Sequence, residues 1–138
     1  MISARARTGP RPEASPRAST PRDRIATVTG STFQQLVLEA RGPIVVEFMS
    51  YGCGHCRELE PILQQVAELL ASRERFFRVN LAVEPELAEQ YQVEGTPTLL
   101  MFLDGAEVGR VDGVRPALST LMTAVTGPFS PRGGGDDA

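Results

Sequence analysis

Continuous apolar runs alternate along the chain with segments whose apolar residues recur every three or four positions. Runs such as 44–49 and 98–103 are nearly all apolar, which predicts strands buried on both faces. Between these runs, apolar residues at helical spacing predict amphipathic helices. The pattern predicts strands over 25–28, 44–49, 76–81, 98–103 and about 107–111, and helices over 33–40, 53–71, 85–91 and 116–125.

This order of elements predicts an α/β fold with a mixed sheet of four or five strands and helices on both faces. The alternation of strands and helices at the start implies parallel pairing through right-handed crossovers. Asp104-Gly105 is the strongest hairpin signal and adds an antiparallel edge. At the first helix, Ser31 followed by Gln34 predicts a capping box, and Gly42-Pro43 ends the helix.

The composition predicts one folded domain between two tails. The first segment, 1–22, is rich in Arg, Pro and Ser and holds almost no apolar residues, so we expect it to be disordered. It lacks the apolar stretch of a secretory signal, but it shares the Arg- and Ser-rich character of organellar transit peptides. We therefore predict a cytoplasmic protein, with an organellar location as the alternative. The domain is expected over 23–127, and the Gly-rich segment 128–138 is predicted to be a flexible tail.

Charge and hydropathy argue against a nucleic-acid partner and against a transmembrane segment. Of the 138 residues, 41% are hydrophobic and 22% charged, and the net charge of −3 combines an Arg-rich start with an acidic remainder. An acidic domain argues against nucleic acid as the partner of the folded part. Because no apolar run reaches about 18 residues, no transmembrane segment is expected.

The candidate chemistry is concentrated in Cys53-Gly54-His55-Cys56, which holds the only cysteines and the only histidine of the chain. Two cysteines at this spacing lie on the same face of a helix, close enough to form a disulfide. The start of a helix also favours a thiolate over a thiol. A buried strand, this pair and a helix together predict thiol–disulfide exchange. A metal site is the alternative, but three ligands within four residues cannot close a tetrahedral zinc site.

Four local motifs extend the pattern along the chain: Val46-Glu47-Phe48, the two cysteines with Pro61 after them, Gly95-Thr96-Pro97-Thr98, and Phe102–Gly105 leading to Gly113. With these motifs, the chain from about Asp23 to Val125 resembles the thioredoxin family. The Cys-Gly-His-Cys centre and Glu47 are similar to those of protein disulfide isomerase domains.

The chain differs from this family pattern in its aromatic residues. It contains no tryptophan, and Gly52 and Met49 stand where the family usually has one. We expect Tyr51 to supply aromatic surface beside the substrate site.

The helix position and the resemblance together suggest roles for four residues. Cys53 is expected to attack a substrate disulfide, and Cys56 to resolve the mixed disulfide. A protonated His55 would stabilise the Cys53 thiolate; the alternative is a solvated loop histidine. A buried Glu47 would accept a proton from Cys56; the alternative is an ordinary strand charge.

The resemblance also implies a substrate groove opposite the cysteines. Thr96-Pro97 is expected to be a cis peptide whose backbone pairs with an extended substrate segment, with a trans turn as the alternative. Gly95 and Gly113 are expected to shape the rim of this groove. Arg78 is a candidate partner of Glu47, although an exposed strand arginine is nearly as well supported. The remaining helical glutamates are expected on solvated faces, namely Glu58, Glu60, Glu68, Glu84, Glu86 and Glu89.

These features predict an enzyme that exchanges thiols and disulfides in proteins, chiefly as a protein-disulfide reductase. The nearer alternative is an isomerase or oxidase in an oxidising compartment, and the more distant one is a non-catalytic module that binds proteins, a metal or a cluster. We expect no bound cofactor, because electrons would come from a separate reductase. The partners would be disulfide-containing proteins, and the chain is expected to act as a monomer.

Overall fold

A five-stranded mixed sheet forms the centre of the protein. The computed structural model describes residues 22–130. The strands are β1 (Ile25–Thr27), β2 (Pro43–Met49), β3 (Arg75–Asn80), β4 (Thr98–Leu103) and β5 (Ala106–Asp112). They lie in the order β1-β3-β2-β4-β5. Pairing is parallel among β1, β3 and β2, and antiparallel from β2 through β4 to β5.

The predicted α/β class is confirmed, but the antiparallel part of the sheet is larger than expected. The Asp-Gly hairpin was expected to add only an antiparallel edge. In the structure, β4 already runs antiparallel to β2, with Glu47 opposite Leu99. The long connection through α3 therefore reverses the chain before the hairpin, and the sequence pattern of α3 does not reveal this reversal.

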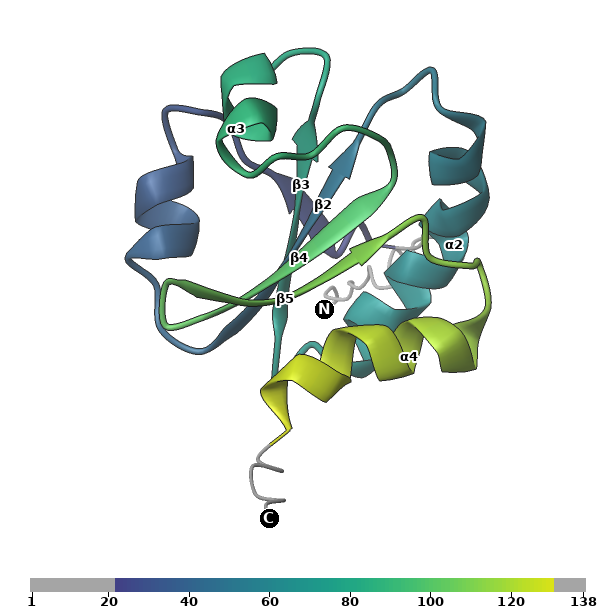
Figure 1. Cartoon of the computed structure of the whole chain (residues 1–138). Coiled ribbons are helices and arrows are strands. Elements are labelled where there is room, and N and C mark those ends of the chain that lie inside the picture. The colour runs from purple at the N-terminus through teal and green to yellow at the C-terminus, as the bar shows by residue number, and fades with distance from the viewer. Residues whose placement is uncertain (1–21, 131–138) are drawn as a thin grey trace, which may run out of the picture.

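Helices cover both faces of the sheet, as predicted. They are α2 (Gly54–Leu69), α3 (Pro85–Gln90) and α4 (Leu118–Thr126), with a short π-helical segment over Gln34–Leu38. Figure 1 shows α2 and α4 on one side of the sheet and α3 with the π-helical segment on the other. Two separate apolar clusters result, one under α2 and α4 and one under the other two helices.

The first cluster fixes α2 over the centre of the sheet. Leu59, Leu63 and Val66 recur on one face of α2 and are at most 1% exposed. They pack with Val45 of β2 and Leu99 of β4. Each such side chain contributes roughly 1.5–3 kcal/mol on burial. This packing holds the start of α2, and with it the two cysteines, at the end of β2.

The hairpin between β4 and β5 forms where the sequence predicts it. Asp104 and Gly105 both have positive φ, at 51° and 85°. Asp104 Oδ1 also accepts a hydrogen bond from the backbone N–H of Gly42 at 2.8 Å. A side chain at position 105 would collide with the carbonyl oxygen of Leu38, so the site requires glycine for space as well as for φ.

The predicted capping box at the first helix is wrong. The helical segment begins after Phe33, and no side chain caps it. Instead, the hydroxyl of Thr32 accepts a hydrogen bond from the backbone N–H of Thr29 at 2.9 Å. The turn before the helix is therefore closed by local threonine contacts, which compete with capping. The hydrogen bond from Glu39 N to Gln34 O gives the segment its wider π-helical turn.

At the C-terminal end, ordered structure extends past the predicted boundary at residue 127. Gly127–Phe129 form a 3₁₀ turn, and Phe129 packs against the apolar cluster under α2 and α4. Phe129 thus packs on the core just beyond the boundary predicted at residue 127, and the extent of the domain stays a prediction. Of the two predicted tails, residues 1–21 and 131–138 lie outside the described part of the chain. Among the helices that the structure describes, none combines the length and apolar character needed to cross a membrane.

Candidate functional site

The two cysteines lie at the start of α2, directly after the end of β2. Cys53 is the N-cap residue, with extended backbone angles, and its Sγ accepts a hydrogen bond from the backbone N–H of Cys56 at 3.1 Å. Both are free thiols in this structure. Cys53 is partly exposed, whereas Cys56 is only 4% exposed. An outer thiol can therefore meet a large substrate, while the inner thiol is protected from one.

The surroundings of the two sulfurs separate their pKa values. Partial burial opposes ionisation of Cys53, but hydrogen bonds from the Cys56 thiol and from the backbone N–H groups of Cys56 and His55 outweigh it and lower the pKa. Burial, followed by the hydrogen bond that its thiol makes to Cys53, raises the pKa of Cys56 to about 11. Because the thiolate is the nucleophilic form, this difference favours ionisation of Cys53 over ionisation of Cys56.

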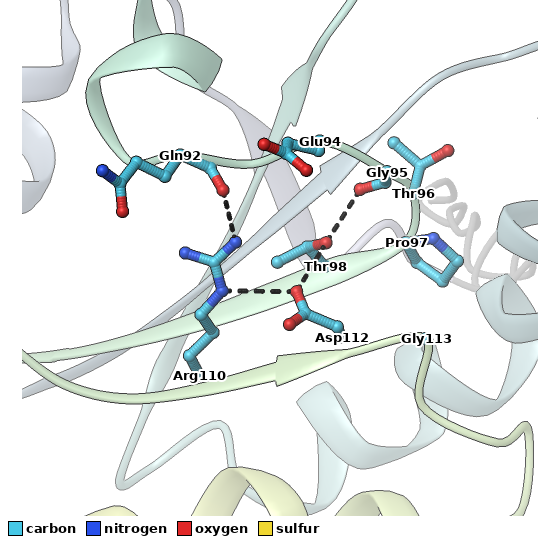
Figure 2. A pocket seen from close by; sticks show the side chains of 9 residues that line it. All are labelled: Gln92, Glu94, Gly95, Thr96, Pro97, Thr98, Arg110, Asp112 and Gly113. Atoms are coloured by element: carbon cyan, nitrogen blue, oxygen red, sulfur yellow. Dashed lines mark hydrogen bonds and ion pairs between the residues drawn. The ribbon is translucent and has the colours of Figure 1, made fainter.

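The loop before β4 faces Cys53, as the resemblance implied. The Thr96-Pro97 peptide bond is cis. The thiol of Cys53 lies 3.7 Å from the carbonyl oxygen of Thr96. A cavity of about 360 Å³ opens here, and its lining includes Gly95, Thr96, Pro97 and Gly113 (Figure 2). The structure thus brings Gly95, Thr96, Pro97 and Gly113 together around one cavity, and only the Thr96 carbonyl contacts Cys53, whereas Tyr51 borders a different cavity.

Polar contacts from β5 hold this loop in place. Arg110 donates hydrogen bonds to the carbonyl oxygens of Tyr91 at 2.7 Å and Gln92 at 2.6 Å. Its Nε lies 3.3 Å from Asp112, and Asp112 in turn accepts a hydrogen bond from the hydroxyl of Thr98 at 3.2 Å. Figure 2 shows the connected series Gln92, Arg110, Asp112 and Thr98 beside the loop. Hydrogen bonds therefore connect β5 with the chain both before and after Thr96-Pro97.

Glu47 is buried in the centre of the sheet, on β2. It is 1% exposed, and neither carboxylate oxygen has a hydrogen-bond partner within the described part of the chain. Burial, together with the negative charge of Glu60, raises the pKa of Glu47 to about 7, and Arg78 opposes this effect. An acid with this pKa can both accept and release a proton near neutral pH.

Arg78 lies beside Glu47 on the neighbouring strand, in register with it. Its side chain is 11% exposed and forms ion pairs with Glu60 of α2 at 2.7 Å and with Asp23 at 3.2 Å. Nη1 also donates a hydrogen bond to the carbonyl oxygen of Ile25 at 2.8 Å. The alternative of an exposed strand arginine is wrong, and so is the expectation that Glu60 lies on a fully solvated helix face. Arg78 therefore binds Glu60 rather than Glu47, although Glu47 is its register neighbour.

A second cavity of about 260 Å³ borders the buried thiol. Cys56, Glu60 and Arg78 contribute to its wall, together with Met49–Tyr51 and Arg57. It therefore connects Cys56 with the Arg78–Glu60 ion pair. Across residues 22–130 there is no group of three or more His, Cys, Asp or Glu side chains placed to hold a metal ion.

Comparisons with known proteins agree with this geometry. The family model for thioredoxin matches residues 24–125. The chain belongs to the thioredoxin family. It is 37% identical over 98 residues to thioredoxin 1 of Synechococcus elongatus, an alignment that covers 71% of this chain and 92% of the relative. It is 32% identical over 107 residues to the chloroplastic thioredoxin M2 of Arabidopsis thaliana, covering 78% of this chain and 56% of the relative. The protein is accordingly a thiol–disulfide oxidoreductase.

Two predicted residues of this thioredoxin-family site lie at its exposed border. The His55 side chain is 85% exposed, and its Nδ1 lies 3.9 Å from a carboxylate oxygen of Glu58. Tyr51 is 69% exposed and borders the cavity at Cys56. The structure therefore leaves the His55 imidazole largely in solvent.

Sequence reasoning missed four polar residues that shape the thioredoxin site: Asp23, Glu60, Arg110 and Asp112. Glu60 follows Cys56 by four positions, the spacing at which two helical residues share a face, so its position held a usable signal. Arg110 and Asp112 alternate on one face of β5, which is also a readable spacing. Nothing in the sequence pattern connects Asp23 with β3, because that contact depends on the sheet order.

Proposed function

We propose that this protein is a protein-disulfide reductase in which Cys53 is the nucleophile and Cys56 the resolving thiol. The observation that supports it most directly is the pairing of a partly exposed thiol of lowered pKa with a buried thiol of raised pKa. A half-exposed thiolate can enter a mixed disulfide with a protein substrate, and a protected second thiol can then complete the exchange.

The proposed reaction has two displacement steps. The Cys53 thiolate attacks one sulfur of the substrate disulfide; the substrate S–S bond breaks, and the departing thiolate takes a proton from solvent. Cys56 then loses its proton to the Glu47 carboxylate, through water in the cavity that borders Cys56 and the Arg78–Glu60 pair. The new thiolate attacks Cys53 Sγ and releases the second substrate thiolate. The substrate gains two electrons and two protons, and the protein retains a Cys53–Cys56 disulfide.

Substrate binding is proposed to use the groove beside Thr96-Pro97. The Thr96 carbonyl lies next to Cys53, and the backbone there can pair with an extended substrate segment. Gly95 and Gly113 leave the rim of the groove open to a peptide backbone. Tyr51 offers exposed aromatic surface on the other side of the cysteines.

The surroundings of His55 support a reductase over an isomerase. An isomerase needs a thiolate that is stabilised strongly enough to make the disulfide a good oxidant. Here the imidazole is 85% exposed and close to Glu58, so solvent and a carboxylate reduce the effect of its charge on Cys53. The relatives reported above are also thioredoxins by name. The isomerase or oxidase alternative rests on the Cys-Gly-His-Cys sequence and Glu47.

The reduction potential of the Cys53–Cys56 pair, equilibrated against glutathione, distinguishes these functions. A reductase predicts a potential near that of thioredoxin, about −270 mV, and an isomerase one near −180 mV. In the same preparation, C56S is expected to form a stable mixed disulfide when its Cys53 thiolate attacks an oxidised, disulfide-containing protein substrate, and C53S is expected to form none. A potential at the isomerase end would overturn the reductase assignment, and trapping through Cys56 in C53S would overturn the order of the two thiols.

Partners and location belong to the same proposal. We propose that an external reductase returns electrons to the disulfide and that the protein acts as a monomer, with no cofactor of its own. We propose a reducing compartment, cytoplasmic or, given relatives named as chloroplastic, organellar. Determining the N-terminal residue of the protein isolated from its host tests the organellar alternative, which predicts that the Arg-rich segment has been removed.

A further inference from the structure

Glu47 lies beside a cation but is not paired with it. Arg78 is the register neighbour of Glu47 on β3, and its positive charge opposes the ionisation cost of this buried acid. Yet both oxygens of Glu47 are without a hydrogen-bond partner in the part of the chain that the structure describes. A buried carboxylate next to a guanidinium would ordinarily take a bidentate pair. Something therefore keeps the guanidinium away from Glu47.

The hydrogen bonds of Arg78 identify what holds it. Nη2 donates to Glu60 Oε2 at 2.7 Å, the shorter of the two carboxylate contacts that the guanidinium makes. Nη1 donates to Asp23 and to the carbonyl oxygen of Ile25. These acceptors all lie toward the β1 edge and α2. The guanidinium is thus committed to partners other than Glu47.

Glu60 is the one of these partners that also adjoins the reacting thiol. It follows Cys56 by one turn of α2, and both residues line the same cavity. The Glu60 side chain is 36% exposed, so water reaches this carboxylate in the cavity wall. Its Oε2 also accepts a hydrogen bond from Gln64 at 2.8 Å, which fixes its direction.

We propose that Glu60 is a positioning residue that holds Arg78 away from Glu47 and adds its own negative charge, so that Glu47 remains a proton carrier near neutral pH. This inference rests on the proposed role of Glu47 in the exchange reaction. The groups around Glu47 fit it. Arg78 on β3 and the apolar Leu99 on β4 are its register neighbours. Glu60 of α2 and Asp23, before β1, both bind Arg78, and Cys56 shares a cavity with Glu60 and Arg78.

The chemical consequence concerns the second displacement. Cys56 must lose a proton as its sulfur forms a bond to Cys53 Sγ and the Cys53–substrate bond breaks. A base whose pKa is near the working pH serves this transfer best. If Arg78 turned to Glu47, the carboxyl would be a permanent anion and a weaker base. Glu60 therefore sets the pH range in which Cys56 resolves the mixed disulfide.

The test compares the variants E60Q, E60D and E68Q with the wild type. Glutamine keeps an acceptor for Arg78 but removes the charge, so E60Q is expected to lower the Glu47 pKa by about one unit. Carbon-13 NMR titration of the Glu47 carboxyl, assigned with E47Q, measures this pKa directly. The acid limb in the pH profile of mixed-disulfide resolution, followed in single turnover, should move by the same amount.

The other variants separate charge from packing. E60D keeps the charge and should return both quantities toward the wild-type values. E68Q removes a glutamate from an exposed position on the same helix and should change neither. An unchanged Glu47 titration in E60Q would overturn the inference, as would an E60D variant that behaves like E60Q.

The same data distinguish failure of this inference from failure of the proposed role of Glu47. If E47Q keeps the acid limb of the wild-type profile, Glu47 is not the proton carrier and the proposed mechanism is wrong at that step. The NMR titration of Glu47 in E60Q would still decide whether Glu60 controls its ionisation.

Discussion

At the scale of single residues, the site depends on how two equal thiols are made unequal. Cys53 receives hydrogen bonds from N–H groups at the start of α2, and Cys56 is buried behind it. The helix N-terminus stabilises negative charge only within its first turn. Hydrogen bonding of one sulfur and burial of the other, rather than any difference in chemistry, separate the two thiols, and this difference supports the proposal that Cys53 attacks and Cys56 resolves.

The residue between the cysteines provides a prediction that separates its ring from its backbone. His55 contributes a backbone N–H to Cys53, while its imidazole is exposed. H55A removes only the ring and is expected to change the reduction potential by less than about 30 mV, a tenfold change in the equilibrium constant. H55P also removes the N–H and is expected to raise the Cys53 pKa and make the disulfide less oxidising.

Thiol titration and equilibration with glutathione measure both effects. Proline is tolerated in the first turn of a helix, so H55P should fold with α2 intact. A large change in H55A, equal to that in H55P, would show that the protonated imidazole stabilises the thiolate. That result would favour the isomerase alternative.

At the scale of elements, two segments that are far apart in the sequence form the site at one end of the sheet. The cysteines follow β2, and the groove precedes β4. Because β2 and β4 are antiparallel neighbours, the end of one strand lies beside the start of the other, with Phe48 opposite Thr98. The pairing direction of β4 thus brings Cys53 and Thr96 together although 43 positions separate them in the chain.

The Arg110 contacts give a prediction at this scale. R110M is expected to loosen the turn after α3 that leads to Thr96-Pro97, because two carbonyl oxygens lose a charged donor. Hydrogen bonds to charged groups contribute about 1.5–3 kcal/mol, so the free energy of unfolding should fall by roughly that amount. KM for a protein disulfide should rise, while the reduction potential of the cysteines stays unchanged.

Chemical denaturation, steady-state kinetics and redox equilibration measure these three quantities. R115M serves as the control, because Arg115 is exposed and near the same edge. A changed potential in R110M with an unchanged KM would contradict a role confined to the substrate groove.

At the scale of the whole molecule, the sequence predicted which elements form but not all of their contacts. The apolar runs, the hairpin at Asp104-Gly105 and the cysteine pair each depend on neighbouring residues, so local pattern was sufficient for them. The antiparallel direction of β4 and the contact between Asp23 and Arg78 depend on the order of strands in the sheet. Glu60 resembled a solvated helical glutamate because its partner is distant in sequence.

Buried carboxyl groups also give the whole molecule a pH-dependent stability. Burial raises the pKa of Glu47 from 4.5 to about 7, a shift that corresponds to about 3 kcal/mol. The folded protein therefore binds more protons than the unfolded chain within this window. The free energy of unfolding must then fall as pH rises from about 4.5 to about 7, and the cost of ionising Glu47 is fully present above it.

The stability profiles of E47Q and E74Q test this account. Burial likewise raises the pKa of Glu74 to about 7, but Glu74 precedes β3, at the end of the sheet away from the cysteines. Urea denaturation at about pH 5 and about pH 7.5 should show a smaller fall in stability for both variants than for the wild type. Only E47Q should also alter the pH profile of mixed-disulfide resolution.

If E47Q kept the full wild-type fall in stability, Glu47 would ionise without cost, and a proton carrier tuned by burial would be excluded. If E74Q altered the resolution profile, the pH dependence of catalysis would reflect overall stability rather than the acid beside Arg78.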